Sequence, residues 1–402
     1  MEPGSKTDND EDGTEFSGFG GHPLTTTPLG LRESGGGDEV QTDLSAFGLL
    51  DAEQVIAVAS VPGIAEELQS VLGVDGETFQ QLLDAALSIL PAERAALVSQ
   101  PAPKDLGLGV IAPTAEMIAA AEAAVDGVDT AEAAVSLPAA VNLVPYMSPI
   151  RNQGSRGTCV SFALTALNEY VVRRRGLERN LSEQHLYAEI KSIDGASASC
   201  GTWQVQAVKA LRDRGECRET VWPYNPNSPC NNHGVRPSQA RPEGLNYRLA
   251  AFQVAARSVA AYKTELSRQR PVTVSVPVYN SWYQSAETRR SGRITMRVGN
   301  EQVEGGHAVC LVGYQDSASS PGGGYFIVRN SWGTTWANQS PYGPGYGTIP
   351  YRYIANDAYE AFSAIVSTVG DDGEDEPNAT TKTNSSVIIQ VGPTVKITIE
   401  SE

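Results

Sequence analysis

A cysteine, a histidine and an asparagine carry the strongest chemical signal in this sequence. Cys159 follows two loop glycines, Gly154 and Gly157, and begins an apolar pattern of helical period that runs to Arg175. A thiol at a helix N-terminus faces unpaired N–H groups and the positive end of the helix dipole, and both stabilise a thiolate. This position can therefore activate a sulfur nucleophile without a metal ion.

His307 and Asn330 extend this chemistry to three residues. His307 follows Gly305 and Gly306 and begins an apolar strand, so its ring can point into a cleft. Asn330 comes directly after the apolar run 325–329, and a neutral amide can orient an imidazole through the second ring nitrogen. Cys159 taken alone would more often be a buried apolar residue. The three residues together predict a Cys–His–Asn catalytic triad.

The segments around these residues resemble the papain family of cysteine peptidases over about residues 138–362. The resemblance implies that Gln153 and the backbone N–H of Cys159 donate to the oxyanion of the tetrahedral intermediate. It also implies an α+β fold of two subdomains, a helical half with the cysteine at the start of a central helix and an antiparallel β half. Further matching residues are the Ser-Glu-Gln segment within 181–184, Trp332, Trp336, Gly345–Gly347, and Pro138–Leu143, which looks like the start of a mature enzyme.

The resemblance also implies a set of substrate-binding residues. Resembling enzymes use a Gly-Gly pair to form backbone hydrogen bonds with an extended substrate. Here Gly201 and Thr202 take the two places, followed by Trp203, and the side chain of Thr202 predicts a narrower pocket. Gly306 and Trp332 complete the expected set. No metal ion or cofactor is expected.

The cysteines depart from the family pattern. Resembling secreted enzymes have a cysteine three residues before the nucleophile, where this chain has Arg156. Five cysteines in 402 residues do not make a disulfide scaffold, so reduced thiols and a cytoplasmic location are the expectation. A zinc site is disfavoured, because Cys230 and His233 have no accompanying Cys-x2-Cys pair. For Cys200, Cys217 and Cys230, structural thiols or a Cys217–Cys230 disulfide are favoured.

Composition divides the chain into five regions. Residues 1–41 are rich in Gly, Asp, Thr and Ser and predict a disordered acidic arm. Residues 42–100 repeat apolar side chains at helical spacing and predict a small helical bundle, while residues 101–137 predict a linker or a strap laid over another domain. Residues 138–363 form the catalytic block. Residues 364–402 predict an acidic linker and a short C-terminal hairpin.

The net charge of −17 is unevenly distributed. Residues 1–140 carry a net −20, residues 141–363 a net +8 and residues 364–402 a net −5. The acidic total argues against a nucleic-acid binder. The sequence has no run of 18 apolar residues, so no transmembrane helix is expected, and its start lacks the pattern of a signal peptide, so export is not expected. The acidic front and basic body predict an N-terminal region that shields the cleft or recruits a partner protein. An acidic solubilising extension is the alternative.

Three functions fit these residues. The favoured one is an endopeptidase acting on peptide or protein substrates, kept as a zymogen by its N-terminal region. The same triad could pass the acyl group to an amine, as in a transpeptidase or peptide ligase, if water is excluded. A catalytically weak protein could use the cleft only to bind peptides, but the intact triad and Gln153 argue against this third function.

Overall fold

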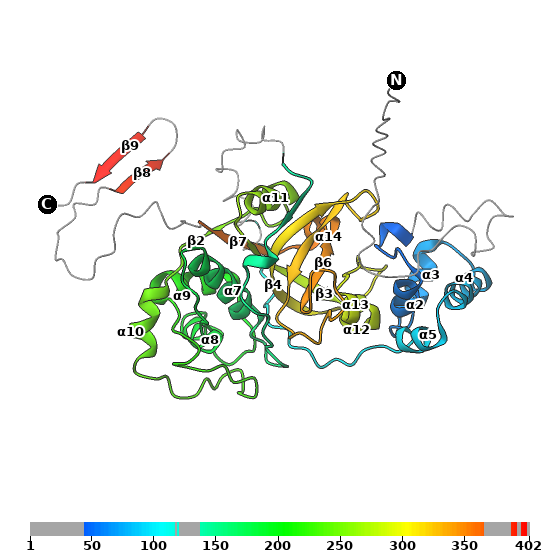
Figure 1. Cartoon of the computed structure of the whole chain (residues 1–402), viewed down its shortest axis with the longest axis horizontal. Coiled ribbons are helices and arrows are strands. Elements are labelled where there is room, and N and C mark those ends of the chain that lie inside the picture. Colours follow the sequence, from blue (N-terminus) through cyan, green and yellow to red (C-terminus); the bar gives the residue numbers. More distant parts are fainter. Residues whose placement is uncertain (1–43, 117–118, 120–136, 366–386, 392–394, 400–402) are drawn as a thin grey trace, which may run out of the picture. The chain divides into compact units, whose positions relative to one another are not determined.

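The computed structural model describes residues 44–116, 119, 137–365, 387–391 and 395–399. The chain divides into two compact units, Met1–Val366 and Ser367–Glu402. The expected acidic arm, and most of the expected linker after residue 364, lie outside the described residues. In Figure 1 the sheet of the first unit lies between the N-terminal helices, in blue and cyan, and a second group of helices in green.

The first described region is a bundle of short helices, called here the N-terminal bundle (residues 44–99). Two of its helices begin at an aspartate whose side chain accepts a hydrogen bond from the helix backbone: Asp51 from Gln54 N and Asp75 from Thr78 N. Apolar side chains at helical spacing form its core, as the sequence pattern predicts. The helices are α2 (Ala52–Ala59), α3 (Ile64–Leu72), α4 (Gly76–Ser88) and α5 (Ala92–Val98).

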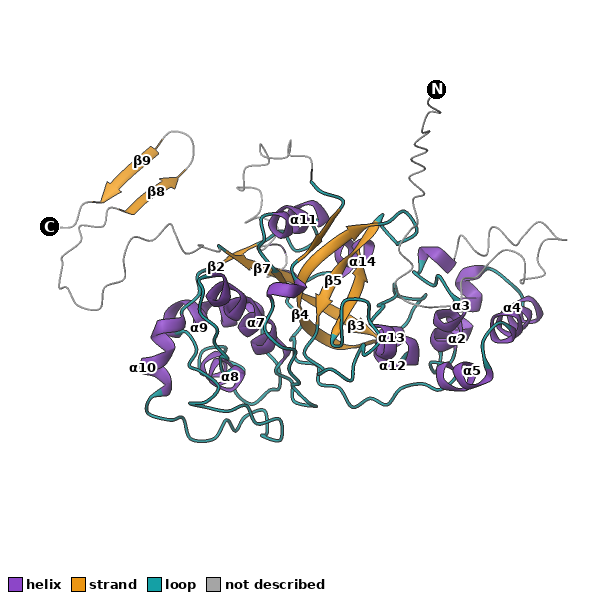
Figure 2. Ribbon diagram, in the orientation of Figure 1, coloured by secondary structure: helices purple, strands orange, loops and turns teal. Residues whose placement is uncertain are grey.

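A second group of helices forms one half of the catalytic block (Figure 2). Its central helix, α7 (Cys159–Arg174), is buried from Cys159 to Val172, which explains why it is apolar on most of its circumference. Gly176, with φ of +78°, follows the end of α7 and reverses the chain. The other helices of this half are α8 (Glu183–Lys191), α9 (Gln204–Arg214) and α10 (Ala240–Gly244).

The other half is an antiparallel sheet in the order β2-β7-β3-β4-β5-β6, with β1 paired to β4. The eight residues of β3 are all buried, because β3 lies in the middle of the sheet and helices cover it. The strands are β1 (Ala140–Asn142), β2 (Ala251–Gln253), β3 (Val272–Tyr279), β4 (Val303–Asp316), β5 (Gly324–Arg329), β6 (Tyr346–Pro350) and β7 (Glu360–Ala364). Helices α11 (Val259–Ser267), α12 (Asn280–Gln284), α13 (Ala286–Ser291) and α14 (Tyr351–Asp357) accompany them, and short 3-10 helices lie at Val144–Tyr146 and Leu245–Tyr247. The expected α+β architecture of a helical half and an antiparallel β half is confirmed.

The second unit contains one antiparallel pair. Strand β8 (Val387–Val391) pairs with β9 (Val395–Ile399), so that Val387 lies opposite Ile399. These strands lie where alternating apolar residues predict a hairpin.

The cysteine pairing differs from the expected one. Cys200 and Cys230 form a disulfide, with their Cα atoms 5.0 Å apart. Cys217 is free and buried in a small apolar cluster with Trp222. The prediction of a Cys217–Cys230 disulfide is therefore wrong, and so is the expectation of reduced thiols for this pair. The reason is that the fold brings together the two loops that hold Cys200 and Cys230, while Cys217 points into the core.

Candidate active site

Cys159 is the first residue of α7, and its side chain is fully buried. Burial raises the pKa of the Cys159 thiol to about 12, because the loss of solvation outweighs the backbone groups beside the thiol, which lower the pKa. The helix N-terminus was expected to favour a thiolate. In this closed state the thiol stays protonated instead, because burial costs more than the helix N-terminus contributes.

His307 lies on β4, and Asn330 follows the end of β5. The imidazole Nε2 of His307 is 2.8 Å from Asn330 Oδ1, and the indole of Trp332 stacks on the imidazole with ring centroids 4.6 Å apart. Among the described residues, Nδ1 of His307 is buried without a hydrogen-bond partner. Burial lowers the pKa of His307 to about 4, although the hydrogen bond with Asn330 opposes this shift. Cys159 packs in one cluster with Ala308, the residue after His307.

The side-chain amide of Gln153 is fixed at both of its ends. Ser331 Oγ donates to Gln153 Oε1 at 2.6 Å, and Gln153 Nε2 donates to the carbonyl of Arg156 at 2.9 Å. The same Nε2 also donates to the carbonyl of Gly107 at 3.1 Å, which accepts a further hydrogen bond from Trp332 Nε1 at 3.1 Å. The Gly107 carbonyl thus occupies a place where Gln153 can stabilise an oxyanion.

Residues 102–111, called here the cleft segment, run from α5 to the place where α7 meets the sheet (Figure 1). The N–H groups of Gly109 and Val110 donate to the carbonyl of Gly306 at 3.0 and 2.9 Å. The N–H of Thr202 donates to Gly109 O, and the N–H of Ile111 donates to Thr202 O, both at 3.0 Å. The backbone groups at Thr202 and Gly306, which were expected to bind substrate, are therefore paired with the chain itself.

Two glycines let the cleft segment approach the catalytic loop closely. A Cβ atom at Gly109 would lie 2.4 Å from the backbone of Gly157, and one at Gly107 would lie 2.6 Å from the carbonyl oxygen of Arg156. These distances exclude any side chain at either position. The Gly-Leu-Gly sequence at residues 107–109 is the signal for this contact, whereas the composition of residues 101–137 predicts only a linker or strap.

The remaining expected substrate-binding residues lie around the cleft segment. Gly201, with φ of +84°, is close enough that a Cβ there would lie 2.7 Å from Gly109 O. Trp332 contacts both His307 and Gly107, as described above. Trp203 follows Thr202 and precedes α9. On the other side, Tyr283 of α12 hydrogen-bonds to the backbone of Leu106, and the N–H of Ala102 donates to Gln284 O at 2.7 Å.

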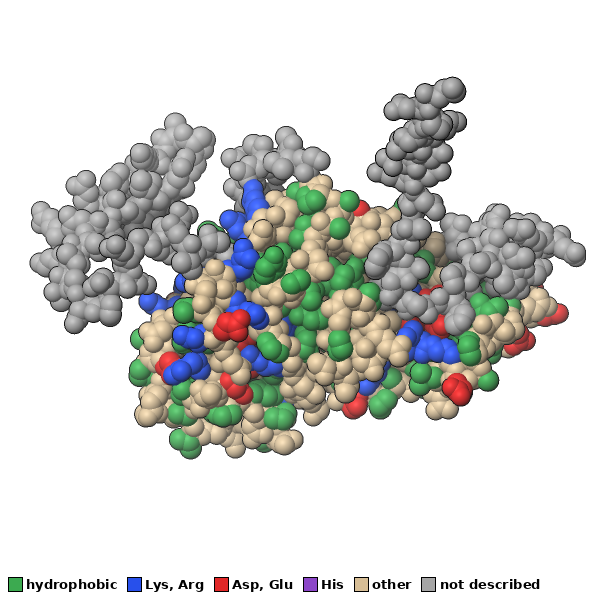
Figure 3. All heavy atoms as spheres, in the orientation of Figure 1, with side chains coloured by type: hydrophobic (Ala, Val, Ile, Leu, Met, Phe, Trp, Pro, Cys, Tyr) green, Lys and Arg blue, Asp and Glu red, His purple; other side chains and the backbone are tan. Residues whose placement is uncertain are grey.

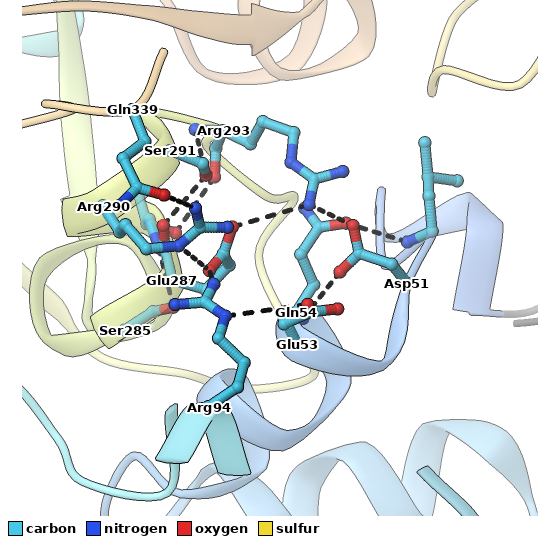
Figure 4. A network of polar contacts seen from close by, with 12 residues as sticks. Asp51, Glu53, Gln54, Arg94, Ser285, Glu287, Arg290, Ser291, Arg293 and Gln339 are labelled. Atoms are coloured by element: carbon cyan, nitrogen blue, oxygen red, sulfur yellow. Dashed lines mark hydrogen bonds and ion pairs between the residues drawn. The ribbon is translucent and has the colours of Figure 1, made fainter. Parts of the chain in front are cut away.

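The N-terminal bundle contacts the β half through buried charges (Figure 4). Arg94 of α5 pairs with Glu287 of α13, and Arg293 pairs with Asp51 of the bundle. Glu287 is also bound by Arg290 of its own helix at 2.7 Å. Bulk charge predicts only that the acidic front docks on the basic body. In the structure each region supplies one cation: the bundle supplies Arg94 to Glu287, and the β half supplies Arg293 to Asp51.

Apolar and backbone contacts accompany this network. Val298 is fully buried in the core of the N-terminal bundle, and the N–H of Met296 donates to Phe47 O at 2.9 Å. The N–H of Asn300 donates to Glu67 Oε2 at 2.9 Å. The loop after α13 is therefore part of the bundle's own core.

Three further features of the described residues bear on other ligands: how surface charge is distributed, whether metal-binding side chains cluster, and whether a helix is long enough to span a membrane. Figure 3 shows basic side chains gathered over the helical half and acidic ones on the outer end of the N-terminal bundle. Within the described ranges, no cluster of three or more His, Cys, Asp or Glu side chains is arranged for a metal ion. None of the described helices combines the length and hydropathy needed to cross a membrane.

The sequence and the fold are similar to those of known proteins. Residues 138–347 match the family model described as papain family cysteine protease. An uncharacterised peptidase C1-like protein of Acanthamoeba polyphaga mimivirus is 23 % identical over 255 residues, which cover 61 % of this chain and 76 % of that protein. A cysteine protease of Blomia tropicalis is 28 % identical over 213 residues, and cathepsin K of Gallus gallus is 28 % identical over 196. These two alignments cover 50 and 48 % of this chain, but only 57 and 54 % of those relatives.

One solved structure is similar over most of its own length. Xylellain, a cysteine protease from Xylella fastidiosa, is 26 % identical in sequence and superposes with a TM-score of 0.50. The match covers 64 % of this chain and 90 % of that one.

Proposed function

Because this chain belongs to the papain family of cysteine proteases, we propose that it hydrolyses peptide bonds with Cys159 as nucleophile, His307 as acid–base group and Asn330 as the residue that orients the imidazole. The observation that carries this proposal is the 2.8 Å contact between His307 Nε2 and Asn330 Oδ1. This contact uses Nε2 of His307 and leaves Nδ1 of the buried ring without a hydrogen-bond partner among the described residues. The strand that carries His307 packs against the helix that begins at Cys159.

The chemistry follows from these positions. The proton of the Cys159 thiol moves to His307, and the sulfur attacks the carbonyl carbon of the peptide bond. The carbonyl π electrons move to oxygen, where Gln153 Nε2 and the backbone N–H of Cys159 stabilise the oxyanion. The oxyanion collapses and expels the amine, which takes the proton from His307. Water then hydrolyses the thioester, and the thiol is regenerated.

The cleft segment keeps this apparatus latent. It contacts Gly157 and Gly306, which lie within two residues of Cys159 and His307 in the sequence. Burial holds both side chains neutral by raising the pKa of the thiol and lowering that of the imidazole. When the segment leaves, water returns and the cost of charging the pair falls, so the proton can pass from sulfur to nitrogen. A peptide substrate then takes the backbone partners that the segment releases at Thr202 and Gly306.

Turnover of a fluorogenic peptide or an unfolded protein by the full chain tests the proposal. Cys159→Ala and His307→Ala should each abolish hydrolysis, whereas Cys217→Ala, which changes a thiol outside the site, should retain it. Unchanged hydrolysis in both the Cys159 and the His307 variants would overturn the assignment. Mass spectrometry of the products, with and without an added amine, separates hydrolysis from acyl transfer.

A further inference from the structure

Arg156 is a buried cation next to the proposed nucleophile, at the position where resembling secreted enzymes have a cysteine. Its side chain is only 3 % exposed. In the described part of the chain, no carboxylate lies within ion-pair distance of its guanidinium, although an uncompensated buried charge is costly. A weakly hydrated, planar guanidinium can meet this cost by binding neutral acceptors and aromatic faces. The contacts of Arg156 are of this kind.

Neutral groups from two elements bind the guanidinium. Nη1 donates to Gln184 Oε1 at 2.7 Å and to the carbonyl of Asn225 at 3.2 Å, and Nη2 donates to His233 Nδ1 at 3.1 Å. The guanidinium carbon lies 4.9 Å from the ring centre of Tyr187, within the range of a cation–π contact. Gln184 also binds the carbonyl of His233 through Nε2 at 2.8 Å. Arg156 thus fastens the loop 225–233 to the start of α8.

The backbone of the same residue holds the oxyanion glutamine. The carbonyl of Arg156 accepts one N–H of the Gln153 amide at 2.9 Å and also the N–H of Thr158 at 2.8 Å. An amide nitrogen has two hydrogens, so this bond leaves the second one to point at the Gly107 carbonyl. A change in the position of residue 156 would therefore turn the donor that stabilises the oxyanion.

The loop 225–233, which Arg156 binds, is linked in turn to the residues that pair with the cleft segment. Cys230, in the loop that Arg156 fastens, is bonded to Cys200, which precedes Gly201 and Thr202. Thr202 pairs with the cleft segment through its backbone. The side chain of Arg156 therefore connects the turn that carries Gln153 to the segment at Gly201 and Thr202, through its hydrogen bonds to the loop 225–233 and the Cys200–Cys230 disulfide.

We infer, on the premise of the proposed peptidase function, that the Arg156 side chain is a positioning residue that sets the orientation of the Gln153 amide for transition-state stabilisation. Arg156 touches neither the substrate carbonyl nor the reacting atoms. It acts through Gln153, because its guanidinium fixes the turn whose carbonyl holds that amide. The inference concerns kcat, since an oxyanion forms only in the transition state and not in bound substrate.

The test is a double-substitution cycle in the full chain, with peptide hydrolysis as readout. Removing one oxyanion donor by Gln153→Ala should lower kcat by roughly 10²- to 10³-fold. Arg156→Met should lower kcat by about tenfold or more with little change in KM. The effect should be smaller than that of Gln153→Ala, because the Gln153 amide is misplaced and not removed. The double variant should be no slower than Gln153→Ala alone, because Arg156 acts through Gln153. Multiplying effects would overturn the inference, and so would wild-type kcat in Arg156→Met.

A second readout separates positioning from general damage. Alkylation of Cys159 by iodoacetamide forms no oxyanion, so its rate should be nearly the same in Arg156→Met and in the parent. A parallel fall in alkylation and hydrolysis would assign Arg156 a purely structural role. Arg156→Lys keeps the charge but lacks the planar guanidinium whose two Nη groups reach acceptors on both sides, so it should fold and lose kcat if the methionine variant does not fold.

A matched control is Arg179→Met, which removes a half-buried arginine bound to Tyr247 Oη in the same helical half. This variant should keep the parent kcat. A parent chain that turns over no peptide, or a Cys159→Ala variant that hydrolyses peptide as fast as the parent, would instead reject the proposed function itself, so the two failures are distinguishable.

Discussion

The cleft segment and the N-terminal bundle both precede the catalytic block, but they are held to it by different forces. The cleft segment is bound mainly through backbone hydrogen bonds between neutral groups at Gly306 and Thr202. Its ion pairs, Lys104–Glu304 and Asp105–Arg289, involve side chains of the segment that are 48 and 60 % exposed. The bundle is bound through buried ion pairs and the insertion of Val298 into its core.

This difference separates a removable part from a fixed one. A peptide substrate offers the same backbone groups as the cleft segment and can replace its hydrogen bonds one for one. No such replacement exists for the buried carboxylate of Glu287, whose loss of Arg94 would leave a desolvated charge with fewer partners. We therefore expect the segment to leave the cleft while the bundle stays attached.

The largest expected effect comes from Gly109→Ala. The added Cβ would lie 2.4 Å from the Gly157 backbone, so the cleft segment cannot stay in place. Peptide hydrolysis by the full chain should rise by about tenfold or more, because a site that is open in a tenth of molecules or fewer gains at least that factor when it opens fully. Steady-state kinetics with a fluorogenic peptide measures the change.

Gly76→Ala is the control for this substitution. Gly76 begins α4, and a Cβ there meets only the end of the Gln69 side chain, at 3.9 Å. Hydrolysis should be unchanged in this variant. Equal activity of Gly109→Ala and the parent would contradict the closed cleft.

The second effect concerns the stability of the bundle contact. Arg94→Met removes the bundle's cation from the buried carboxylate of Glu287. A buried charge left without a partner costs roughly 3 to 5 kcal/mol, but because Glu287 keeps Arg290, the cost here should be about 1 to 3 kcal/mol. The free energy of unfolding, measured in urea, should fall by an amount of this order. Arg212→Met breaks only an exposed pair with Asp213 and should change it little. A loss in Arg94→Met no larger than in Arg212→Met would remove the distinction between the two regions.

The third effect is a pH dependence that comes from the closed cleft. Burial lowers the pKa of His307 from 6.5 to about 4, so the unfolded chain binds this proton more readily than the closed chain. The contribution of His307 to the free energy of unfolding is therefore full above pH 6.5. It is lost as the pH falls from 6.5 to about 4, because the unfolded chain takes up the proton first. Between about pH 7.5 and about pH 5 the parent should lose about 2 kcal/mol more of its free energy of unfolding than His307→Gln does. Identical losses would mean that the imidazole is not desolvated.

The smallest effect is that of salt. The exposed ion pairs of the cleft segment are screened by salt, but its backbone hydrogen bonds are not. Raising the ionic strength from about 0.05 to about 0.5 M should therefore change the activity of the full chain by less than about twofold. A large activation by salt would favour docking by bulk charge, which the acidic front and basic body first indicated.

Residues in local motifs could be predicted from the sequence, because a strand end or a helix start fixes where a side chain lies. The structure places His307 beside Asn330 and Gln153 in the loop before α7. Strand β4 begins four residues earlier than expected, at Val303, and His307 is its first buried residue. The helices of the N-terminal bundle also follow their apolar spacing. In each case the position of the side chain depends on residues that are close to it in the sequence, so the sequence pattern is enough to predict it.

Features that depend on contacts distant in sequence could not be predicted. The partner of Cys230 is decided by which loops meet in space, so the Cys217–Cys230 pair favoured from the sequence is wrong and Cys200 is the partner. The cleft segment binds through its backbone, which leaves no side-chain pattern beyond two glycines. The raised pKa of Cys159 follows from burial in the folded chain, whereas the sequence shows only the helix N-terminus that opposes it.

The central claim is that Cys159 is a nucleophile made latent by the cleft segment. Labelling with an epoxide inactivator of thiol proteases, followed by intact mass and peptide mapping, tests it most directly. The parent and Gly109→Ala should each gain a single adduct, at Cys159, and the adduct should form at least about tenfold faster in Gly109→Ala. Equal labelling rates, or an adduct at Cys217 or Cys310, would contradict it.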